Sequence, residues 1–352
     1  MYRIILAGVL TAVFMGALCV HATPKYQDIL DTPAIRSHLA QKGLLNGIAW
    51  AGKRLVSVGQ RGNIIYSDDR GKSWIQADVP VSSDLVSVYF PTEKKGWAVG
   101  HDGVVLKSED SGATWVKQFD GRAAARVMKC YYTAHPPAGE EKERLLKEVD
   151  RFVGEGPDKP FLDVWFEDEN SGFIVGAFNL IFSTSDGGKN WKPWLDRTEN
   201  PELLHLYSVK RIGCDIYIAG EQGLVMRFDR TAGKFQRMET PYPGTFFGVT
   251  GKAGSVVVYG MRGNVYRSAD RGETWSKIET GIPVGLMGAA VAEDGRIILV
   301  SQAGNVLVSR DGGASFKTAK MEIPCFTSAV AALNGDAVVM TGLNGVQHQT
   351  IK

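Results

Sequence analysis

The sequence has little excess of charge of either sign. It carries 40 Lys and Arg against 38 Asp and Glu, a formal net charge of +2. Such a balance indicates no general electrostatic attraction to nucleic acid, so we expect no nucleic-acid partner. Cysteine is scarce too, because beyond the first 22 residues only Cys130, Cys214 and Cys325 occur. Three scattered cysteines supply neither a disulfide framework nor the spacing of metal ligands, and we expect no metal and no small-molecule cofactor.

Long hydrophobic runs are missing except at the N-terminus. The run Ile4–Val20 follows Arg3 and ends just before Ala22. A short positive segment, an apolar stretch and small residues are typical of a secretion signal, which we expect over residues 1–22. Cleavage near Ala22 would leave a periplasmic or secreted protein. An uncleaved anchor is the alternative, although the run is short for a span of ~20 residues. A lipid-bearing Cys19 is less expected, because no large aliphatic residue stands three positions before it.

Glycine, in contrast, is abundant, and it recurs in two periodic patterns. The first is Ser/Thr-x-Asp-x-Gly-x-(polar)-aromatic, which occurs five times and ends at Trp74, Trp115, Trp191, Trp275 and Phe316. The second is Gly-x-x-Gly between two β-rich runs, which with its variants begins at Gly59, Gly100, Gly176, Gly220, Gly260, Ser301 and Gly342. A recurrence of about 40 residues is typical of a repeat architecture.

The two patterns together predict the fold. Two residues between glycines, flanked by β-rich runs, favour a tight hairpin. The aspartate pattern follows the second strand of this hairpin and predicts a turn that leads into a further strand. Four short strands per repeat are typical of a propeller blade. We predict an all-β, seven-bladed β-propeller of four-stranded antiparallel blades over residues 23–352. The last unit, Phe326–Lys352, holds only three strands, and we expect Ala34–Gln41 to supply the fourth.

The aspartate pattern is the Asp-box that sialidases and many other propellers share. A short carboxylate there accepts backbone N–H bonds within its own turn, glycine permits a positive φ, and the aromatic ring packs between strands. We therefore predict a structural role, not metal binding or acid–base chemistry. The residues concerned are Asp69, Asp110, Asp186, Asp270 and Asp311, with Trp74, Trp115, Trp191 and Trp275.

The Gly-x-x-Gly turns lie on the opposite side from the Asp-boxes, on what we call the top face. This face also carries the connections from one blade to the next. Its turn residues differ from blade to blade, which leaves them free to form a site, although solvated turns without a function are the alternative. The predicted partner-binding residues are Arg61, His101, Asp102, Phe178, Asn179, Glu221, Arg262 and Gln302.

An insertion at about residues 119–160 separates the second blade from the third and leaves from the same face. It contains Arg122 and Arg126, two further candidates for partner binding, and an amphipathic stretch, Glu140–Phe152, that predicts a short helix. The apolar side of that helix needs a cover, either the propeller itself or a partner protein. Cys130 and Cys325 both lie on top-face connections, so they form the only pair worth testing for a disulfide.

Several longer segments resemble the photosystem II stability and assembly factor family, in its non-photosynthetic bacterial branch. They are Gly96–Gly103, Leu162–Phe166, Leu203–Tyr207, Ala219–Gly223 and Thr240–Gly244. The resemblance implies an exported scaffold, without enzymatic activity, that holds a membrane or envelope protein during assembly; for the bacterial branch it implies a transporter as one candidate partner. It also implies an arginine-rich binding patch, to which Arg61 and Arg262 are the matching positions here. We expect a monomer.

Two rival functions share the blades. A sialidase-like glycoside hydrolase would need an arginine triad and an Arg-Ile-Pro motif, yet the Ile-Pro pairs here, Ile282-Pro283 and Ile323-Pro324, have no arginine before them. A sugar-binding propeller would need exposed aromatic rings on the top face, where Phe178, Tyr242 and Phe246 are candidates. Neither rival has a specific motif in its favour, so the sequence favours a binding scaffold.

Overall fold

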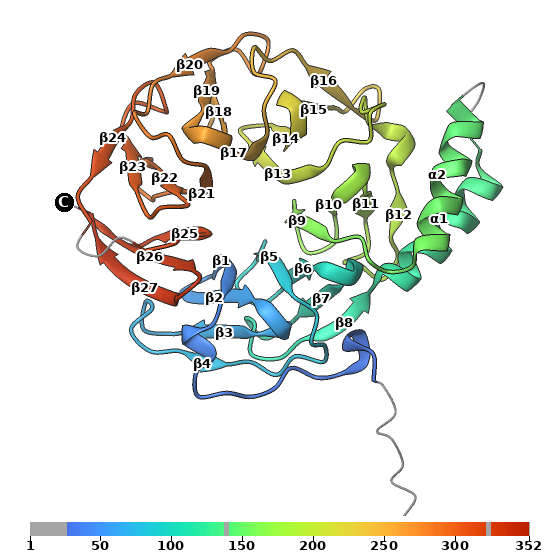
Figure 1. Ribbon diagram of the computed structural model, residues 1–352, viewed down its shortest axis with the longest axis horizontal. Coiled ribbons are helices and arrows are strands. Elements are labelled where there is room, and N and C mark those ends of the chain that lie inside the picture. Colours follow the sequence, from blue (N-terminus) through green and yellow to red (C-terminus); the bar gives the residue numbers. More distant parts are fainter. Residues whose placement is uncertain (1–26, 137–140, 322–324, 352) are drawn as a thin grey trace, which may run out of the picture.

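The computed structural model describes residues 27–136, 141–321 and 325–351, which form a ring of seven antiparallel sheets around a central channel (Figure 1). The sheets follow one another in chain order, and each begins with its innermost strand. Six sheets have four strands and the seventh has three. The predicted all-β, seven-bladed propeller is confirmed, apart from the outer strand of its last blade.

The blades have the following bounds. Blade 1 holds β1 (Leu45–Ala51), β2 (Arg54–Gly59), β3 (Ile64–Ser67) and β4 (Ile75–Gln76); blade 2 holds β5 (Leu85–Tyr89), β6 (Gly96–Gly100), β7 (Val105–Ser108) and β8 (Val116–Phe119); blade 3 holds β9 (Phe161–Phe166), β10 (Gly172–Gly176), β11 (Ile181–Thr184) and β12 (Lys192–Pro193); blade 4 holds β13 (Leu206–Ile212), β14 (Asp215–Gly220), β15 (Val225–Asp229) and β16 (Lys234–Met238).

Blade 5 holds β17 (Phe246–Lys252), β18 (Ser255–Gly260), β19 (Val265–Ser268) and β20 (Ser276–Ile278); blade 6 holds β21 (Leu286–Val291), β22 (Ile297–Ser301), β23 (Val306–Ser309) and β24 (Lys317–Ala319); blade 7 holds β25 (Ala329–Ala332), β26 (Ala337–Gly342) and β27 (Gly345–Thr350). Short 3₁₀ turns are η1 (Ile29–Asp31), η2 (Ala40–Lys42), η3 (Gln60–Gly62), η4 (His101–Gly103), η5 (Ala177–Asn179), η6 (Leu195–Arg197), η7 (Glu221–Gly223) and η8 (Met261–Gly263).

The core lies between neighbouring blades. The second strand of a blade is buried on both faces, as in β6, where every residue is buried, so it reads as a continuous apolar run. Its side chains meet those of the next blade: the rings of Trp97 in blade 2 and Phe166 in blade 3 stack with centroids 3.6 Å apart. Packing between blades, not within one sheet, therefore supplies most of the apolar burial.

The first glycine of each Gly-x-x-Gly turn is required by a close approach of two strands. A Cβ on Gly100 would lie 2.1 Å from the carbonyl oxygen of Asp84, and one on Gly59 would lie 2.1 Å from that of Leu44. Real atoms do not approach so closely, so only glycine fits at Gly59 and Gly100; in blade 6 the corresponding residue is Ser301.

The outer strand of blade 7 is where the sequence prediction is wrong. Ala34–Gln41 does not pair with β27. It runs along blade 1 instead, where the backbone N–H of Ala34 donates to Val79 (3.0 Å) and that of Ser37 donates to the Gln76 side chain (2.8 Å). Within the described residues blade 7 keeps three strands. The segment is held at blade 1 because Gln76 offers both an acceptor and a donor, its Nε2 donating to Ile35.

The insertion forms two helices, α1 (Gly121–Ala134) and α2 (Glu141–Glu155), where the sequence predicted one. They lie beside each other at the outer rim of blade 3, next to β12 (Figure 1). Their apolar sides share a buried cluster with the propeller, to which Met128, Tyr132, Val149 and Phe152 contribute. The Tyr132 hydroxyl donates to Asp196 and accepts from the Leu195 N–H, both at 2.9 Å. The propeller itself therefore covers the insertion.

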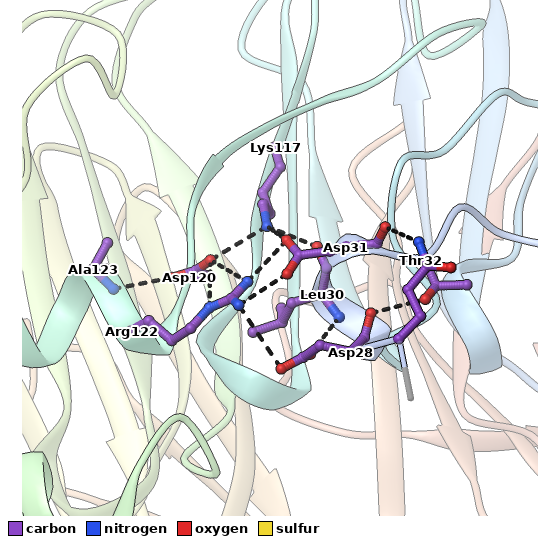
Figure 2. A network of polar contacts seen from close by, with 9 residues as sticks. Asp28, Leu30, Asp31, Thr32, Lys117, Asp120, Arg122 and Ala123 are labelled. Carbon is purple, nitrogen blue, oxygen red and sulfur yellow. Dashed lines mark hydrogen bonds and ion pairs between the residues drawn. The ribbon is translucent and has the colours of Figure 1, made fainter. Parts of the chain in front are cut away.

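The N-terminal segment is fixed to the start of this insertion (Figure 2). The Asp31 carboxylate accepts hydrogen bonds from both terminal nitrogens of Arg122, at 2.9 and 3.0 Å, and from Lys117 at 2.8 Å. Those hydrogen bonds, the one from Arg122 first, hold the pKa of Asp31 well below its usual range. Asp120 caps α1 through the Ala123 N–H and also contacts Arg122. We call Asp31, Lys117, Asp120 and Arg122 the rim clamp.

Candidate functional site

The five aspartate turns share one geometry on the face opposite the top face. In the fifth blade the Asp270 carboxylate accepts hydrogen bonds from the Ser268 hydroxyl, the Thr274 N–H and the Thr274 hydroxyl. The hydrogen bond from the Thr274 hydroxyl, with the others, lowers the pKa of Asp270 to about 2. Asp69, Asp110, Asp186 and Asp311 repeat this arrangement. The oxygens are committed to their own turns, and no group of metal-ligating side chains occurs within the described ranges.

The aromatic residues that close these turns are not equivalent. The indole N–H of Trp74 and that of Trp115 donate to the turn glycine, at 3.1 and 3.0 Å. The corresponding atoms of Trp191 and Trp275 are buried without a partner in the described structure. The rings therefore serve mainly as packing surface between strands.

The top-face turns have a second residue in the left-handed region. Its φ is 54° at Arg61, 57° at Asp102, 53° at Phe178 and 55° at Arg262. This conformation turns the side chain away from the sheet, and the side chains of Arg61, Phe178 and Arg262 are exposed. The neighbouring candidates His101 and Gln302 are exposed as well, whereas Asp102 and Glu221 are half-buried.

Two predicted residues do not belong to an exposed top-face surface. Asn179 is only 2% exposed, and its amide bonds to Thr198 and Asn200 inside the blade 3–4 connection. Arg122 is committed to the rim clamp, because Asp31 and Asp120 neutralise its guanidinium. Arg126 lies on the exposed side of α1. The insertion touches the edge of the top face, where α1 begins beside the turn η4 and Arg151 of α2 lies 5.2 Å from the Phe178 ring.

The central channel is a cavity of about 490 Å³ lined by the innermost strands. Its one buried carboxylate among the described lining residues is Asp163 of β9, which is 5% exposed. Asp163 accepts hydrogen bonds from the Ser87 hydroxyl (2.7 Å), the Val209 N–H (2.9 Å) and the Lys210 ammonium (2.9 Å). It thereby joins blades 2, 3 and 4, and its acceptor capacity is used within the protein.

A row of aromatic rings follows one side of the channel mouth. The Phe178 and His205 ring centroids are 4.5 Å apart, those of His205 and Tyr207 are 6.3 Å apart, and those of Tyr207 and Phe247 are 5.7 Å apart. Sequence reasoning missed His205, Tyr207 and Phe247 and chose Phe246, which is fully buried. The signal was present, because Phe247 follows a residue that begins a buried strand and must therefore point to the opposite face.

Exposed apolar side chains gather on the same face. Phe178 and Met261 belong to turns between second and third strands, as does Leu343, and Phe326 belongs to a connection between blades. Their exposed fractions are 38%, 41%, 56% and 38%, in the order Phe178, Met261, Leu343, Phe326. Apolar groups left in water on one face, here in several blades, are typical of a surface that binds another molecule.

Other features limit the chemistry of this face. The three cysteines of the described residues, Cys130, Cys214 and Cys325, are free thiols, so no disulfide joins Cys130 to Cys325. Among the described helices none is long and apolar enough to cross a membrane. These features define the class: a seven-bladed β-propeller with structural aspartate turns on one face and a partly apolar surface on the other.

Comparison with known proteins gives the family. Residues 11–123 and 153–322, well over half of the chain, match the family described as "Photosynthesis system II assembly factor YCF48". The chain belongs to this family. Residues 124–152, the greater part of the insertion, fall outside the match.

Individual relatives agree with this. The Photosystem II assembly lipoprotein Ycf48 of Synechococcus sp. (strain CC9902) is 30% identical over 156 residues, which cover 43% of this chain and 46% of that protein. The chloroplastic Photosystem II stability/assembly factor HCF136 of Oryza sativa subsp. japonica is 24% identical over 208 residues, 51% of this chain and 48% of that protein. The chain thus spans about half the length of the curated relatives it matches.

Solved structures support the fold. YCF48 bound to a D1 peptide superimposes with a TM-score of 0.62 at 15% identity, over 94% of this chain and 99% of that one. The WD40 propeller domain of Doa1 gives a TM-score of 0.60 at 10% identity, over 92% and 96% of the two chains. At these identities the likeness concerns the fold alone.

Proposed function

We propose that this protein is an exported assembly scaffold, not an enzyme, and that its top face holds a segment of a membrane or envelope protein. The observation that carries the proposal is the set of exposed apolar side chains on the top face, Phe178, Met261, Phe326 and Leu343. Membership of the YCF48 family supports it, and so does a relative that was solved with a bound peptide.

The chemistry of the face suits an extended peptide. Apolar contacts supply affinity, and the exposed Arg61 and Arg262 offer hydrogen bonds and charge to backbone or carboxylate groups of the partner. His101 and Gln302 add polar contacts on other blades. The partner is thus gripped from several blades at once, which a single blade could not do.

The proposal extends to location and partner. Cleavage near Ala22 places the propeller outside the cytoplasm, where the exposed loops of an envelope protein, a transporter among the candidates, are available. The scaffold acts as a monomer. Arg126 on the outer side of α1 would extend the contact to the rim.

A pull-down from host membranes tests the proposal. The paired change Met261→Glu and Leu343→Glu puts two charges into the apolar surface, where their desolvation opposes partner binding. We expect the captured membrane protein to be lost, while thermal stability stays near that of the wild type because both side chains are exposed.

The matched control is Val291→Glu, because Val291 is similarly exposed (44%) but lies at the opposite end of the first strand of blade 6. Equal capture by the wild type and the top-face variant would contradict the proposal. Deleting residues 119–160 is a less informative test, because it would remove the core residues Tyr132, Val149 and Phe152 and so destabilise the fold itself.

A sugar-binding propeller is the second candidate, and the aromatic row from Phe178 to Phe247 is the observation in its favour. A glycoside hydrolase is less well supported, since Asp163 and Glu221 are both engaged in hydrogen bonds to neighbouring strands. Hydrolysis of a chromogenic sialoside or glucoside that Glu221→Gln abolishes would overturn the non-enzyme proposal.

A further inference from the structure

The outer edge of blade 7 is open. β27 is the third and outermost strand of its sheet, whereas in every other blade a fourth strand pairs with the third (Figure 1). Gly342 and Gly345 flank its two-residue turn and form the closing pair of the hairpin. Because hydrogen-bonded pairs alternate along an antiparallel hairpin, Val346, His348 and Thr350 direct their backbone groups away from β26. No backbone hydrogen bond to these groups occurs within residues 27–136, 141–321 and 325–351.

The other outer strands are protected along their edges, whereas β27 is contacted beside its first residue, Gly345, where the turn η2 packs against it. Each of the others carries a lysine, as in β8, β12, β16, β20 and β24, or is covered by the N-terminal segment, as in β4. Charged residues, proline and short length are the usual means by which proteins prevent pairing at a sheet edge. β27 has the sequence Gly-Val-Gln-His-Gln-Thr, without Asp, Glu, Lys, Arg or Pro, and at 6 residues it is longer than β16, which has 5.

A groove lies on each side of this edge. The groove toward blade 6 has a volume of about 590 Å³ and apolar walls from Val308, Ala319 and Ile351. The groove toward blade 1 has a volume of about 510 Å³ and includes Trp74 and Val346. Side chains of a strand alternate between its two faces, so a strand added to β27 would place them in both grooves.

The charge of the grooves selects the chemistry of the added strand. Arg310 and Lys317 line the first groove, and neither forms an ion pair within the described chain. Lys42 and Lys72 line the second and are unpaired there as well. The carboxylates in the first lining are already engaged, Asp311 by its own turn and Asp336 by Arg296. Four unengaged cations favour acidic side chains in the ligand.

We propose that β27 binds an extended, acidic segment of another protein, which completes blade 7 as its fourth strand. A second copy of β27 lacks the required carboxylates. The chain's own residues 1–26 lack them too, because they contain Arg3 and Lys25 but no Asp or Glu. The site follows the outer rim of blade 7 and reaches its top-face turn only at Asn344, which lines the second groove, and it goes beyond the proposed function. Backbone pairing supplies affinity, and the groove contacts supply selectivity.

Binding of a defined peptide tests the proposal. The probe is fluorescein-labelled Glu-Glu-Val-Val-Glu-Glu-Val-Val, blocked at both ends, which offers acidic and apolar side chains to both grooves. We expect anisotropy to show saturable binding to the wild type. His348→Pro removes one outward N–H without affecting the pairs to β26, and it should abolish binding. The double variant Lys72→Glu and Lys317→Glu should weaken it at least ~10-fold.

Controls separate edge pairing from charge attraction. Lys277→Glu on β20, an outer strand of blade 5, should leave binding unchanged. A probe with N-methyl groups at alternate residues keeps its charge but cannot pair, and it should not bind. Failure of the probe to bind the wild type, or equal binding by His348→Pro, would overturn the proposal.

Two further outcomes would overturn it as well. Slow amide exchange at Val346, His348 and Thr350 in the isolated monomer would mean that the chain's own residues already pair with the edge. A dimer that His348→Pro dissociates would assign the edge to a second copy. The pull-down tests the top-face side chains Met261 and Leu343, whereas the peptide assay tests the edge of β27. A failure of the pull-down would therefore not change the interpretation of the peptide assay.

Discussion

One carboxylate oxygen of Glu221 contacts His205 twice: its Oε2 lies 2.8 Å from the backbone nitrogen and 2.9 Å from Nδ1 of the ring. The first contact joins the turn η7 to the start of blade 4, and the second orients the imidazole beside Phe178. Glu221 is therefore a positioning residue for the aromatic row at the channel mouth.

Glu221→Ala should release the His205 ring and weaken partner capture without unfolding the protein. Both side chains are about a quarter exposed, so we expect a stability loss of only ~1 kcal/mol. The ring resonances of His205 and Phe178 in NMR spectra report the loosening directly. The conservative variant Glu221→Gln retains an acceptor and should restore much of the order; equal disorder in both variants would contradict this role.

Asp163→Ala should be far more costly. It removes the acceptor shared by Ser87, Val209 and Lys210, and the buried N–H of Val209 is then left without a partner. We expect a loss of about 3 kcal/mol in the free energy of unfolding, measured by denaturant titration. Lys210→Met, whose side chain is partly exposed, serves as the milder comparison. A loss below ~1 kcal/mol for Asp163→Ala would show that the three blades do not depend on this carboxylate.

Arg122→Met should loosen the N-terminal segment while leaving the propeller folded. The rim clamp joins Asp31 to α1 through the Arg122 ion pair. The remaining attachments are Lys117 of blade 2, which donates to Asp31 and to the Leu30 carbonyl, and the hydrogen bonds to blade 1. We expect limited proteolysis to cut sooner before Leu45, with little change in thermal unfolding. Arg126→Met, a neighbouring exposed arginine, is the matched control, and similar cleavage rates in the two variants would contradict the clamp.

Acid should weaken the aspartate turns over a defined range. The pKa of Asp270 is about 2 in the folded protein and ~3.9 in an unfolded chain. A lowered folded pKa means that the carboxylate stabilises the protein above about pH 4, and that this contribution is lost as the pH falls toward 2. Asp270→Asn cannot titrate, so its thermal midpoint should depend less steeply on pH in that range. Parallel curves for the two proteins would disprove the assignment.

The sequence was sufficient for the ring because the repeated glycines and aspartates each follow from local chemistry. Gly100 is required by a backbone contact and Asp270 by its own turn, so both leave a signal at a fixed spacing. The site leaves no such signal. Asn179 and Phe178 are adjacent in one turn, yet one is buried in a hydrogen-bond network and the other faces solvent. Only the packing of the following connection, which places Thr198 and Asn200 against Asn179, decides between them.

The position of the insertion illustrates the same limit. Its amphipathic pattern predicted a helix and the need for a cover, but not which surface would provide it. Tyr132 settles this by a hydrogen bond to Asp196, 64 residues further along the chain. A contact at that separation depends on how blade 3 packs beside the insertion, so no local pattern reports it.

Blade 1 is built wholly from residues 45–76 and blade 7 wholly from residues 329–350. The two ends of the ring therefore meet without a shared sheet, through contacts such as the hydrogen bond from the indole N–H of Trp50 to the Ala332 carbonyl and the packing of η2 against β27. Within the described residues, no backbone hydrogen bonds between strands join the first blade to the last. What sets this junction apart is that blade 1 does not follow blade 7 along the chain, so no connecting segment spans it as one spans the other junctions. Under mechanical tension across the ring, we expect blades 7 and 1 to separate before the hydrogen bonds within any sheet break.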